Sequence, residues 1–345
     1  MTYSASQYLL IGLAAFVLAG LLTWPTRKLA IRIGAMDRPN LDRKTQKEPV
    51  PYLGGVSIVL TIFVISYAAI AINNPTSEKF KLASYVLIPA LILGLMGLMD
   101  DLKGLNALPR LVVQTIAAVF VSIILIQTET MGFAFGNQII DVIVTILWIV
   151  GICNSINFFD NLDGGAAGTV AISSIALAYL ALNGDQYLIA ALSVVTAGST
   201  LGFLVWNKSP AKIYMGDAGA LFLGVLLASL TVRFEPTAQK QIGSFLIPVF
   251  LLAIPILDTT VAVFSRIRRH LSPFQGGQDH LSHRLIRSGL TRKTSAIILW
   301  SLSGLFAGVS VLLPNASQSS TNYLLIGAGL TWIFLFVGFF RTKDS

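Results

Sequence analysis

Eleven apolar stretches run from one end of the chain to the other, and each approaches the length that crosses a lipid bilayer. A spanning helix needs about 20 apolar residues, with roughly 17 to 25 tolerated. The stretches lie at about 7–24, 53–73, 83–99, 109–127, 138–153, 165–182, 187–205, 218–233, 243–264, 294–313 and 322–340. Because a helix satisfies its own backbone hydrogen bonds in lipid, the pattern predicts an all-α polytopic membrane bundle.

The number of transmembrane helices is expected to be ten or eleven. The fifth, sixth and eighth stretches are short or rich in glycine, so they are the ones expected to be re-entrant or buried within the bundle. Only 12% of the residues are charged, against about 25% in soluble proteins. No fixed-period repeat or soluble linker interrupts the pattern, so residues 1–345 are predicted to form a single membrane domain.

Lys and Arg are distributed unevenly between the two sets of loops. Of the 24 Lys and Arg residues, 20 fall in alternate segments, at about 25–52, 100–110, 206–217, 265–293 and 341–345. The positive-inside rule assigns these segments, and the polar segment 154–165, to the cytoplasm and the N-terminus to the outside. The net charge of +8 then follows from topology and attraction to anionic lipid, and a nucleic-acid partner is not required.

Acidic residues gather at the predicted cytoplasmic ends of the apolar stretches. Asp100 and Asp101 directly follow the third stretch, and adjacent carboxylates favour a divalent cation or a nearby positive side chain. Asp217 precedes the eighth stretch, where an aspartate is equally suited to cap a helix. Asp258 lies inside the ninth stretch, and an intramembrane carboxylate is a functional candidate by default.

The most informative motif is the run that begins at Asn154 and reads Asn-Ser-Ile-Asn-Phe-Phe-Asp-Asn-Leu-Asp-Gly-Gly. On a helix, Asn154, Asn157 and Asn161 would share one face, with Asp160 and Asp163 on a neighbouring face. Such a group at the end of an apolar segment is costly unless it binds something. The alternative is a set of polar contacts between helices.

Two of the predicted cytoplasmic loops carry residues suited to phosphate. His280, His283 and Arg284 lie close together in the second basic loop, and arginine forks and histidine donors both bind phosphate oxygens. Lys47 precedes a Gly-Gly turn that would suit an anion, or it is one more positive-inside lysine. Zinc is disfavoured because His-x-x-His alone lacks further ligands. The absence of a P-loop motif argues against an ATP-driven pump.

Together these motifs predict one metal-assisted site for anionic substrates on the cytoplasmic face. In their order over about residues 24–293 they resemble the polyprenyl-phosphate N-acetylhexosamine-1-phosphate transferase family, glycosyltransferase family 4. The resemblance implies transfer of a sugar-1-phosphate from a UDP-sugar to undecaprenyl phosphate, with release of UMP. It further implies dependence on Mg²⁺, with Mn²⁺ as a substitute, and a place in the bacterial plasma membrane.

The resemblance also assigns roles to residues of this sequence. The implied catalytic residues are Asp100, Asp101 and Asp217; the implied metal ligands are Asp217, Asn154 and Asp101; the implied substrate-binding residues are Lys47, Arg110, Asn157, Asp160, Asp163, Asp258, His280, His283 and Arg284. Asp100 is the candidate base that acts on the lipid phosphate. Direct displacement by that phosphate is the favoured mechanism, and a covalent intermediate on Asp217 is its rival.

Departures from the family pattern bear on the sugar. Lys103 follows Asp101 by two residues, where the pentapeptide-transferring members have a spacing of three, and Ser282 stands where a histidine is usual. The histidine loop and Asp258 resemble the GlcNAc type, so UDP-GlcNAc is favoured over UDP-MurNAc-pentapeptide. A secondary transporter is the alternative of another class, although transporters tend to place acidic sites near the midplane between repeated halves. A homodimer is compatible with the sequence.

Overall fold

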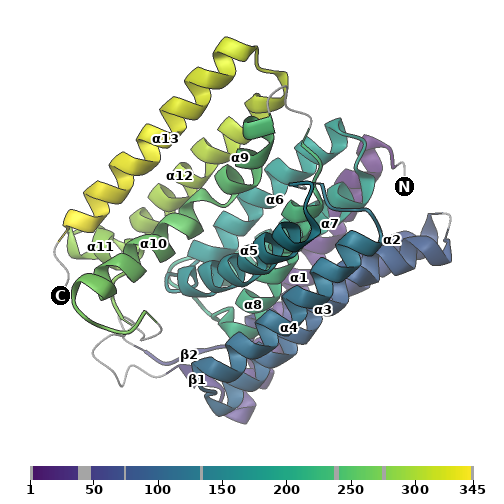
Figure 1. Cartoon of the computed structure of the whole chain (residues 1–345). Helices are drawn as coiled ribbons and strands as arrows, with labels where there is room; N and C mark the ends of the chain where they lie inside the picture. Colours follow the sequence, from purple (N-terminus) through teal and green to yellow (C-terminus); the bar gives the residue numbers. More distant parts are fainter. Residues whose placement is uncertain are drawn as a thin grey trace.

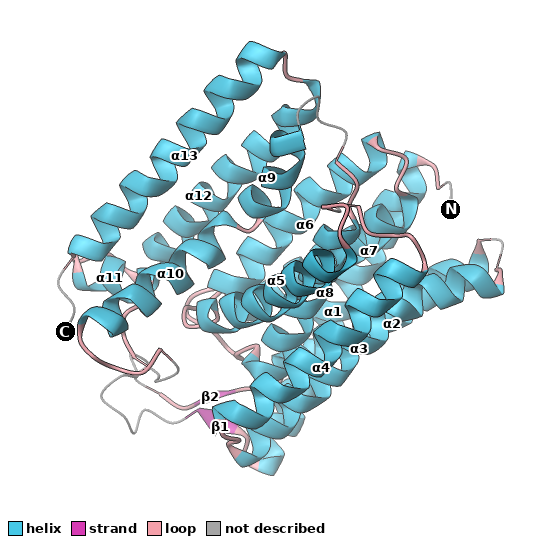
Figure 2. Cartoon of the chain, in the orientation of Figure 1, coloured by secondary structure: helices cyan, strands magenta, loops and turns pink. Residues whose placement is uncertain are grey.

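Helices make up most of the described chain (Figure 1, Figure 2). The computed structural model describes residues 3–37, 48–73, 75–132, 135–236, 241–273 and 277–342. The helices are α1 (Ala5–Ile33), α2 (Gly54–Ile72), α3 (Ser77–Lys103), α4 (Ala107–Gln127), α5 (Gln138–Phe159), α6 (Gly165–Asn183), α7 (Tyr187–Asn207), α8 (Gly216–Arg233), α9 (Gln241–Leu251), α10 (Ala253–Arg268), α11 (Leu281–Arg287), α12 (Arg292–Leu312) and α13 (Gln318–Arg341). A short 3₁₀ turn (Leu313–Asn315) follows α12, and β1 (Met36–Asp37) pairs antiparallel with β2 (Val50–Pro51).

The prediction of a polytopic all-α membrane bundle is confirmed. Ten helices of the described chain are long and apolar enough to cross a membrane, and α9 with α10 makes an eleventh if the bent pair is one span. Of the three stretches expected to be re-entrant or buried, none is broken. The sixth and eighth, α6 and α8, are the spans most deeply buried inside the bundle, as expected, whereas the fifth, α5, is less buried.

The ninth stretch is the one that breaks, with a bend of 75° between α9 and α10. Pro255 has no N–H to donate to the carbonyl of Leu251, four residues earlier, so the helix cannot continue unchanged there. Ser173 on α6 donates to that carbonyl oxygen at 2.6 Å. Trp332 on α13 likewise donates to the carbonyl of Ala253 at 3.2 Å. Neighbouring helices therefore satisfy the backbone groups around the break.

Two predicted loop boundaries are wrong. α1 continues through Pro25 to Ile33 and ends at Gly34, whose φ of 74° suits a left-handed helix cap. The segment predicted as a loop from residue 25 therefore begins as helix. Similarly, α5 runs on to Phe159, so the first six residues of the segment 154–165 are helical. Asn161 and Asp163 lie beyond the helix end and do not share its faces.

Glycines allow α8 to approach its neighbours closely. A Cβ on Gly97 of α3 would lie 2.3 Å from the carbonyl oxygen of Asp217, and one on Gly55 of α2 would lie 2.1 Å from the backbone nitrogen of Gly219. Small residues at such crossings bring backbones together in membrane bundles. The start of α8, which carries Asp217, is thus held directly against the end of α3, which carries Asp100 and Asp101.

Gly97→Ala is expected to disturb both stability and the geometry around Asp217. The added methyl meets backbone, which cannot rotate away as a side chain would, so a loss of about 1–3 kcal/mol is expected. Gly151→Ala on α5 is the matched control, because a Cβ there meets nothing within 4 Å. Thermal unfolding in detergent should separate the two variants. Equal unfolding temperatures would contradict the close crossing.

The motif-bearing segments gather at one end of the bundle. β1, β2 and α11 lie at that end in Figure 1, whereas the N-terminus and the α12–α13 connection lie at the other. The helices α3 and α5 end there, and α8 and α12 begin there. Five loops distant in sequence therefore face a common space.

Candidate active site

A polar cavity of about 700 Å³ lies at this end of the bundle. Each of the five predicted cytoplasmic loops contributes to its wall, for example through Asp37, Gly104, Asp160, Tyr214 and Gly277. The carboxylates in its lining are Asp37, Asp100, Asp101, Asp160, Asp163 and Asp217. Among the described lining residues, Arg292 is the one arginine or lysine. The cavity is therefore strongly acidic and suits a bound cation.

Arg110 links two of the predicted catalytic carboxylates. Its Nη1 donates to Asp100 Oδ2 at 2.6 Å and to Asp217 Oδ2 at 2.9 Å. The other oxygen of Asp100 accepts from the backbone N–H of Leu105 at 2.6 Å. The other oxygen of Asp217 accepts from Nδ2 of Asn157 at 2.7 Å. The structure thus brings Asp100, Arg110, Asn157 and Asp217 into one hydrogen-bonded group.

Asp101 caps the start of α8. Its two carboxylate oxygens accept from the backbone N–H groups of Asp217 at 2.9 Å and Ala218 at 3.1 Å. A carboxylate in this place satisfies free N–H groups and complements the helix dipole. The capping role considered for Asp217 therefore belongs to Asp101. Gly216 has a φ of 74°, and a Cβ on it would lie 2.7 Å from Asp101 Oδ2, so this turn requires glycine.

Asp160 and Asp163 follow the end of α5. Burial, reinforced by the nearby carboxylates of Asp217 and Asp101, raises the pKa of Asp160 to about 8. Asp163 is buried, and its oxygens accept from Nη1 of Arg292 at 2.9 Å and from the backbone N–H of Ala211 at 3.3 Å. The cavity thus holds more acidic groups than it can keep ionised without added positive charge.

The histidine loop is oriented by a buried carboxylate. Asp258 of α10 is fully buried, and its oxygens contact Nδ1 of His280 and the backbone N–H of Leu281, each at 2.7 Å. His280 lines the cavity, whereas Asp258 does not. On the other side of the ring, Nη2 of Arg266 lies 3.3 Å from Nε2 of His280. Asp258 therefore positions His280 and stands away from the cavity.

Asp279 anchors the same loop. It accepts from Nε of Arg266 at 2.7 Å and forms a second ion pair with Arg269. Burial opposes ionisation of Asp279, but the two guanidinium groups prevail and lower its pKa. Neither Asp279 nor Arg266 was predicted from the sequence, because neither the loop nor the basic cluster indicates which acid and base meet.

Arg284, an implied substrate-binding residue, is buried and absent from the cavity lining. Its Nε donates to the carbonyl of Asp279 at 2.7 Å, and its Nη2 donates to Oγ of Ser265 at 2.6 Å. Its Nη1 donates to the carbonyls of Phe339 and Thr342, each at 2.8 Å. The guanidinium consequently joins α11 and α10 to the end of α13.

The remaining predicted residues divide between the cavity and its surroundings. Asn157 and His283 line the cavity. Asn154 is not in the lining, and its Nδ2 donates to Gln114 Oε1 and to the carbonyl of Val150, each at 2.8 Å. Lys47 lies outside the described residues.

Arg292 is a site residue that sequence reasoning missed. It reads as an ordinary positive-inside residue next to the span 294–313, but it lines the cavity and pairs with Asp163. One signal was available. Arg292 is the first residue of α12, and a cation in the first turn is opposed by the helix dipole unless an acid is nearby. Tyr52 and Tyr214, which also line the cavity, carried no such signal.

Stability in acid should depend on His283. Burial, with His280, Arg287 and Arg292 nearby, lowers the pKa of His283 to about 4. The ordinary histidine pKa is about 6.5, so the unfolded chain takes up the proton first, and stability should fall by roughly 2 kcal/mol between pH 7 and pH 5. In His283→Gln this part of the acid dependence should disappear.

The measurement is the unfolding temperature in detergent at pH 7 and pH 5. His270→Gln is the matched control, since His270 is exposed, and it should keep the wild-type dependence. An identical acid dependence in wild type and His283→Gln would rule out the low pKa.

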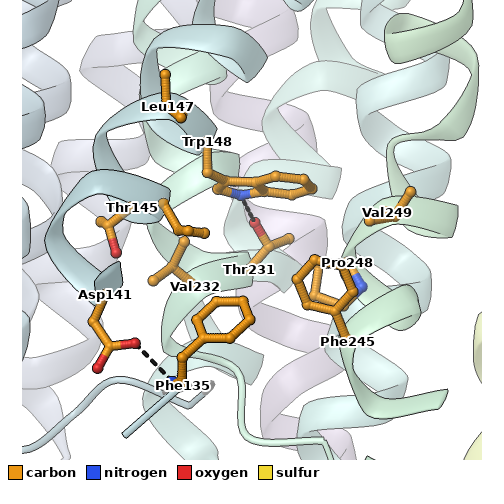
Figure 3. A pocket seen from close by; sticks show the side chains of 11 residues that line it. Phe135, Asp141, Thr145, Leu147, Trp148, Thr231, Val232, Phe245, Pro248 and Val249 are labelled. Carbon is orange, nitrogen blue, oxygen red and sulfur yellow. Dashed lines mark hydrogen bonds between the residues drawn. The ribbon is translucent and has the colours of Figure 1, made fainter. Parts of the chain in front are cut away.

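A second, apolar pocket of about 280 Å³ lies between α5, α8 and α9 (Figure 3). Trp148 forms part of its wall and donates to Oγ1 of Thr231 at 3.0 Å, while Asp141 accepts from the N–H of Phe135 at 2.7 Å. Trp148 precedes Asn157 by nine residues on α5, a rise of about 14 Å. The lining suits hydrocarbon and is separate from the acidic cavity.

The donor set of the acidic cavity fits magnesium by its chemistry. Carboxylate oxygens are the ligands that hard divalent cations prefer. Across the described ranges, however, no three His, Cys, Asp or Glu side chains converge as a ready metal site. Asp101 faces backbone N–H groups, and Arg110 stands between Asp100 and Asp217. Carboxylates suited to magnesium therefore line the cavity, but their contacts with backbone N–H groups and Arg110 keep them from converging on one point.

Fold and cavity together define a multi-pass membrane protein with an acidic site at one end of its bundle. Residues 83–235 match the family model described as glycosyl transferase family 4. The chain is 32% identical over 302 residues to the probable undecaprenyl-phosphate N-acetylglucosaminyl 1-phosphate transferase of Bacillus subtilis, covering 86% of this chain and 82% of the relative.

Two further relatives extend the comparison. The decaprenyl-phosphate N-acetylglucosaminephosphotransferase of Mycobacterium tuberculosis is 32% identical over 347 residues, covering 92% of this chain and 85% of that protein. The undecaprenyl-phosphate alpha-N-acetylglucosaminyl 1-phosphate transferase of Salmonella typhi is 26% identical over 310 residues, covering 87% and 82%. The chain belongs to glycosyl transferase family 4.

Proposed function

We propose that the protein transfers GlcNAc-1-phosphate from UDP-GlcNAc to undecaprenyl phosphate and releases UMP. The observation that carries the proposal is the acidic cavity, in which carboxylates from α3, α8 and the segment after α5 meet beside Arg110 and Arg292. The names of the relatives supply the sugar phosphate and the polyprenyl phosphate acceptor. A site at one end of the bundle suits a nucleotide from water and a phosphate at the membrane surface.

The reaction forms a bond between an oxygen of the lipid phosphate and the phosphorus next to the sugar. The bond from that phosphorus to the bridging oxygen breaks, and UMP leaves with the electron pair. Two anions must approach, so the positive charge of Arg292 and the donors of His280 would offset their repulsion. Asp100 is proposed as the group that accepts a proton from the lipid phosphate.

Magnesium is proposed as the cofactor, with Asp101, Asp217 and Asn154 as the implied oxygen ligands. When bound, it would neutralise phosphate charge and stabilise the departing UMP. The chain's own groups then orient the substrates: Asn157 holds Asp217, and Asp258 holds His280. Asn154 remains the least supported of the implied ligands, because it stands outside the lining.

The site is proposed to face the cytoplasm of a bacterial cell, in the plasma membrane. The support is the Lys and Arg distribution, with 20 of 24 residues on the segments that belong to the cavity end or the C-terminus. The pocket near Trp148 is a candidate place for part of the hydrocarbon chain of the acceptor, since its lining is apolar.

The test is UMP release by purified protein with Mg²⁺, undecaprenyl phosphate and either UDP-GlcNAc or UDP-MurNAc-pentapeptide. Lipid-dependent UMP from UDP-GlcNAc is the expected result. UMP released only from UDP-MurNAc-pentapeptide would change the proposed sugar donor and leave the proposed reaction unchanged. No UMP from either donor with folded protein would overturn the proposal, and flux in proteoliposomes without UMP would support a transporter. Inversion at phosphorus would favour direct displacement over a covalent intermediate on Asp217.

A further inference from the structure

We infer that Arg110 is a resident counter-cation that holds the place of a divalent ion between Asp100 and Asp217, and that ion entry displaces it. The inference rests on the proposed function for the identity of the ion as a cofactor. It concerns the ion-free protein, in which Arg110 would act as a counter-charge and not as a catalytic or substrate-binding residue.

Arg110 contacts the two carboxylates through one nitrogen atom, as a single positive charge would. An arginine that recognises one carboxylate normally uses two nitrogens as a fork. Here a single nitrogen, Nη1 of Arg110, is shared by Oδ2 of Asp100 and Oδ2 of Asp217, at 2.6 and 2.9 Å. One positive centre thus serves two carboxylate oxygens of the kind that would also suit a divalent cation.

The local backbone does not favour a cation at this place. Arg110 lies near the start of α4, where the helix dipole opposes positive charge. The two acids must therefore outweigh the dipole to keep the guanidinium there. In the described part of the chain, Nε and Nη2 of Arg110 have no acceptor. Its side chain is held only through Nη1 and is free to leave when another cation takes the acids.

The same contact explains why ligand types suited to magnesium do not converge. Asp100 and Asp217 already share a positive partner, and an ion at that position would bring two positive centres together. Ion and guanidinium are therefore alternatives. Arg110 thus keeps the two acids neutralised without the metal and sets the concentration at which the metal enters.

The test is Mn²⁺ binding to detergent-purified protein, followed by the electron paramagnetic resonance signal of free Mn²⁺ without nucleotide or lipid. Arg110→Gln should bind Mn²⁺ about tenfold more tightly, because the competing charge is gone. Arg110→Lys, which keeps the charge, should stay within about threefold of wild type. Arg292→Gln is the matched control: it also removes one positive charge, here from the cavity wall, but the carboxylate that Arg292 pairs with is Asp163.

Three results would overturn the inference. Equal tightening in Arg110→Gln and Arg292→Gln would mean that only the overall charge matters. Weaker binding in Arg110→Gln, with Arg110→Lys folded by size exclusion, would mean that Arg110 organises the acids. No saturable binding in wild type or Arg110→Gln would mean that no ion enters. Because no substrate is present, the expected pattern would stand even if UMP release failed.

Discussion

Asp217→Asn should lower UMP release by roughly a thousandfold, the loss expected when one pre-arranged charged group is removed from a site of charge development. Asp217 contacts Arg110 and Asn157 at once, and it lies beside the cap that Asp101 makes on α8. The amide keeps the shape but removes the negative charge that a metal ion or Arg110 requires. Asp100→Asn should act similarly, since it shares Arg110.

The control for this result is a carboxylate away from the cavity. Asp185 lies between α6 and α7, at the opposite end of the bundle from Asp217, so Asp185→Asn should retain wild-type UMP release. Unfolding temperature and size-exclusion profile must show that each variant is folded and inserted. Near-normal turnover in both Asp217→Asn and Asp100→Asn would mean that the acidic cavity is not the active site.

Arg284→Ala should destabilise the protein by about 3–5 kcal/mol, because a large buried side chain and several of its hydrogen bonds are lost together. Arg284 is among the largest fully buried side chains, and its donors hold the carbonyls of Asp279, Phe339 and Thr342. Without the guanidinium the carbonyls of Asp279 and Thr342 lose this donor, whereas Phe339 still accepts from Thr342. The end of α13 should consequently separate from α10 and α11.

The measurement is the unfolding temperature together with the KM for UDP-GlcNAc. In Arg284→Ala the temperature should fall steeply, while KM of the folded fraction stays within about twofold because the residue does not line the cavity. Arg287→Ala is the control, since Arg287 is exposed on the same short helix and donates only to the carbonyl of Gln278 among the described contacts. Normal stability with a raised KM would mean that Arg284 binds the substrate and does not chiefly stabilise the fold.

The acidic part of the site could be predicted from sequence because carboxylates at the ends of apolar helices have few other uses. Asp100, Asp101, Asn157, Asp160, Asp163 and Asp217 all border the one cavity. The basic and histidine part was harder to predict. An arginine binds phosphate, a carboxylate or a carbonyl equally well, so the sequence could not separate Arg292, which lines the cavity, from Arg284, which joins helices.

By itself the sequence determined the bundle and the end at which its motifs meet, since both follow from the length of apolar runs and the spacing of charge along the chain. The tertiary structure decided three other matters. It placed the helix break at Leu252, where Ser173 on α6 donates a hydrogen bond to the freed carbonyl of Leu251. It made Asp258 a support for His280, and it set Arg110 between Asp100 and Asp217. Each depends on a partner distant in sequence, and hydrogen-bond partners of that kind are fixed only when the helices pack.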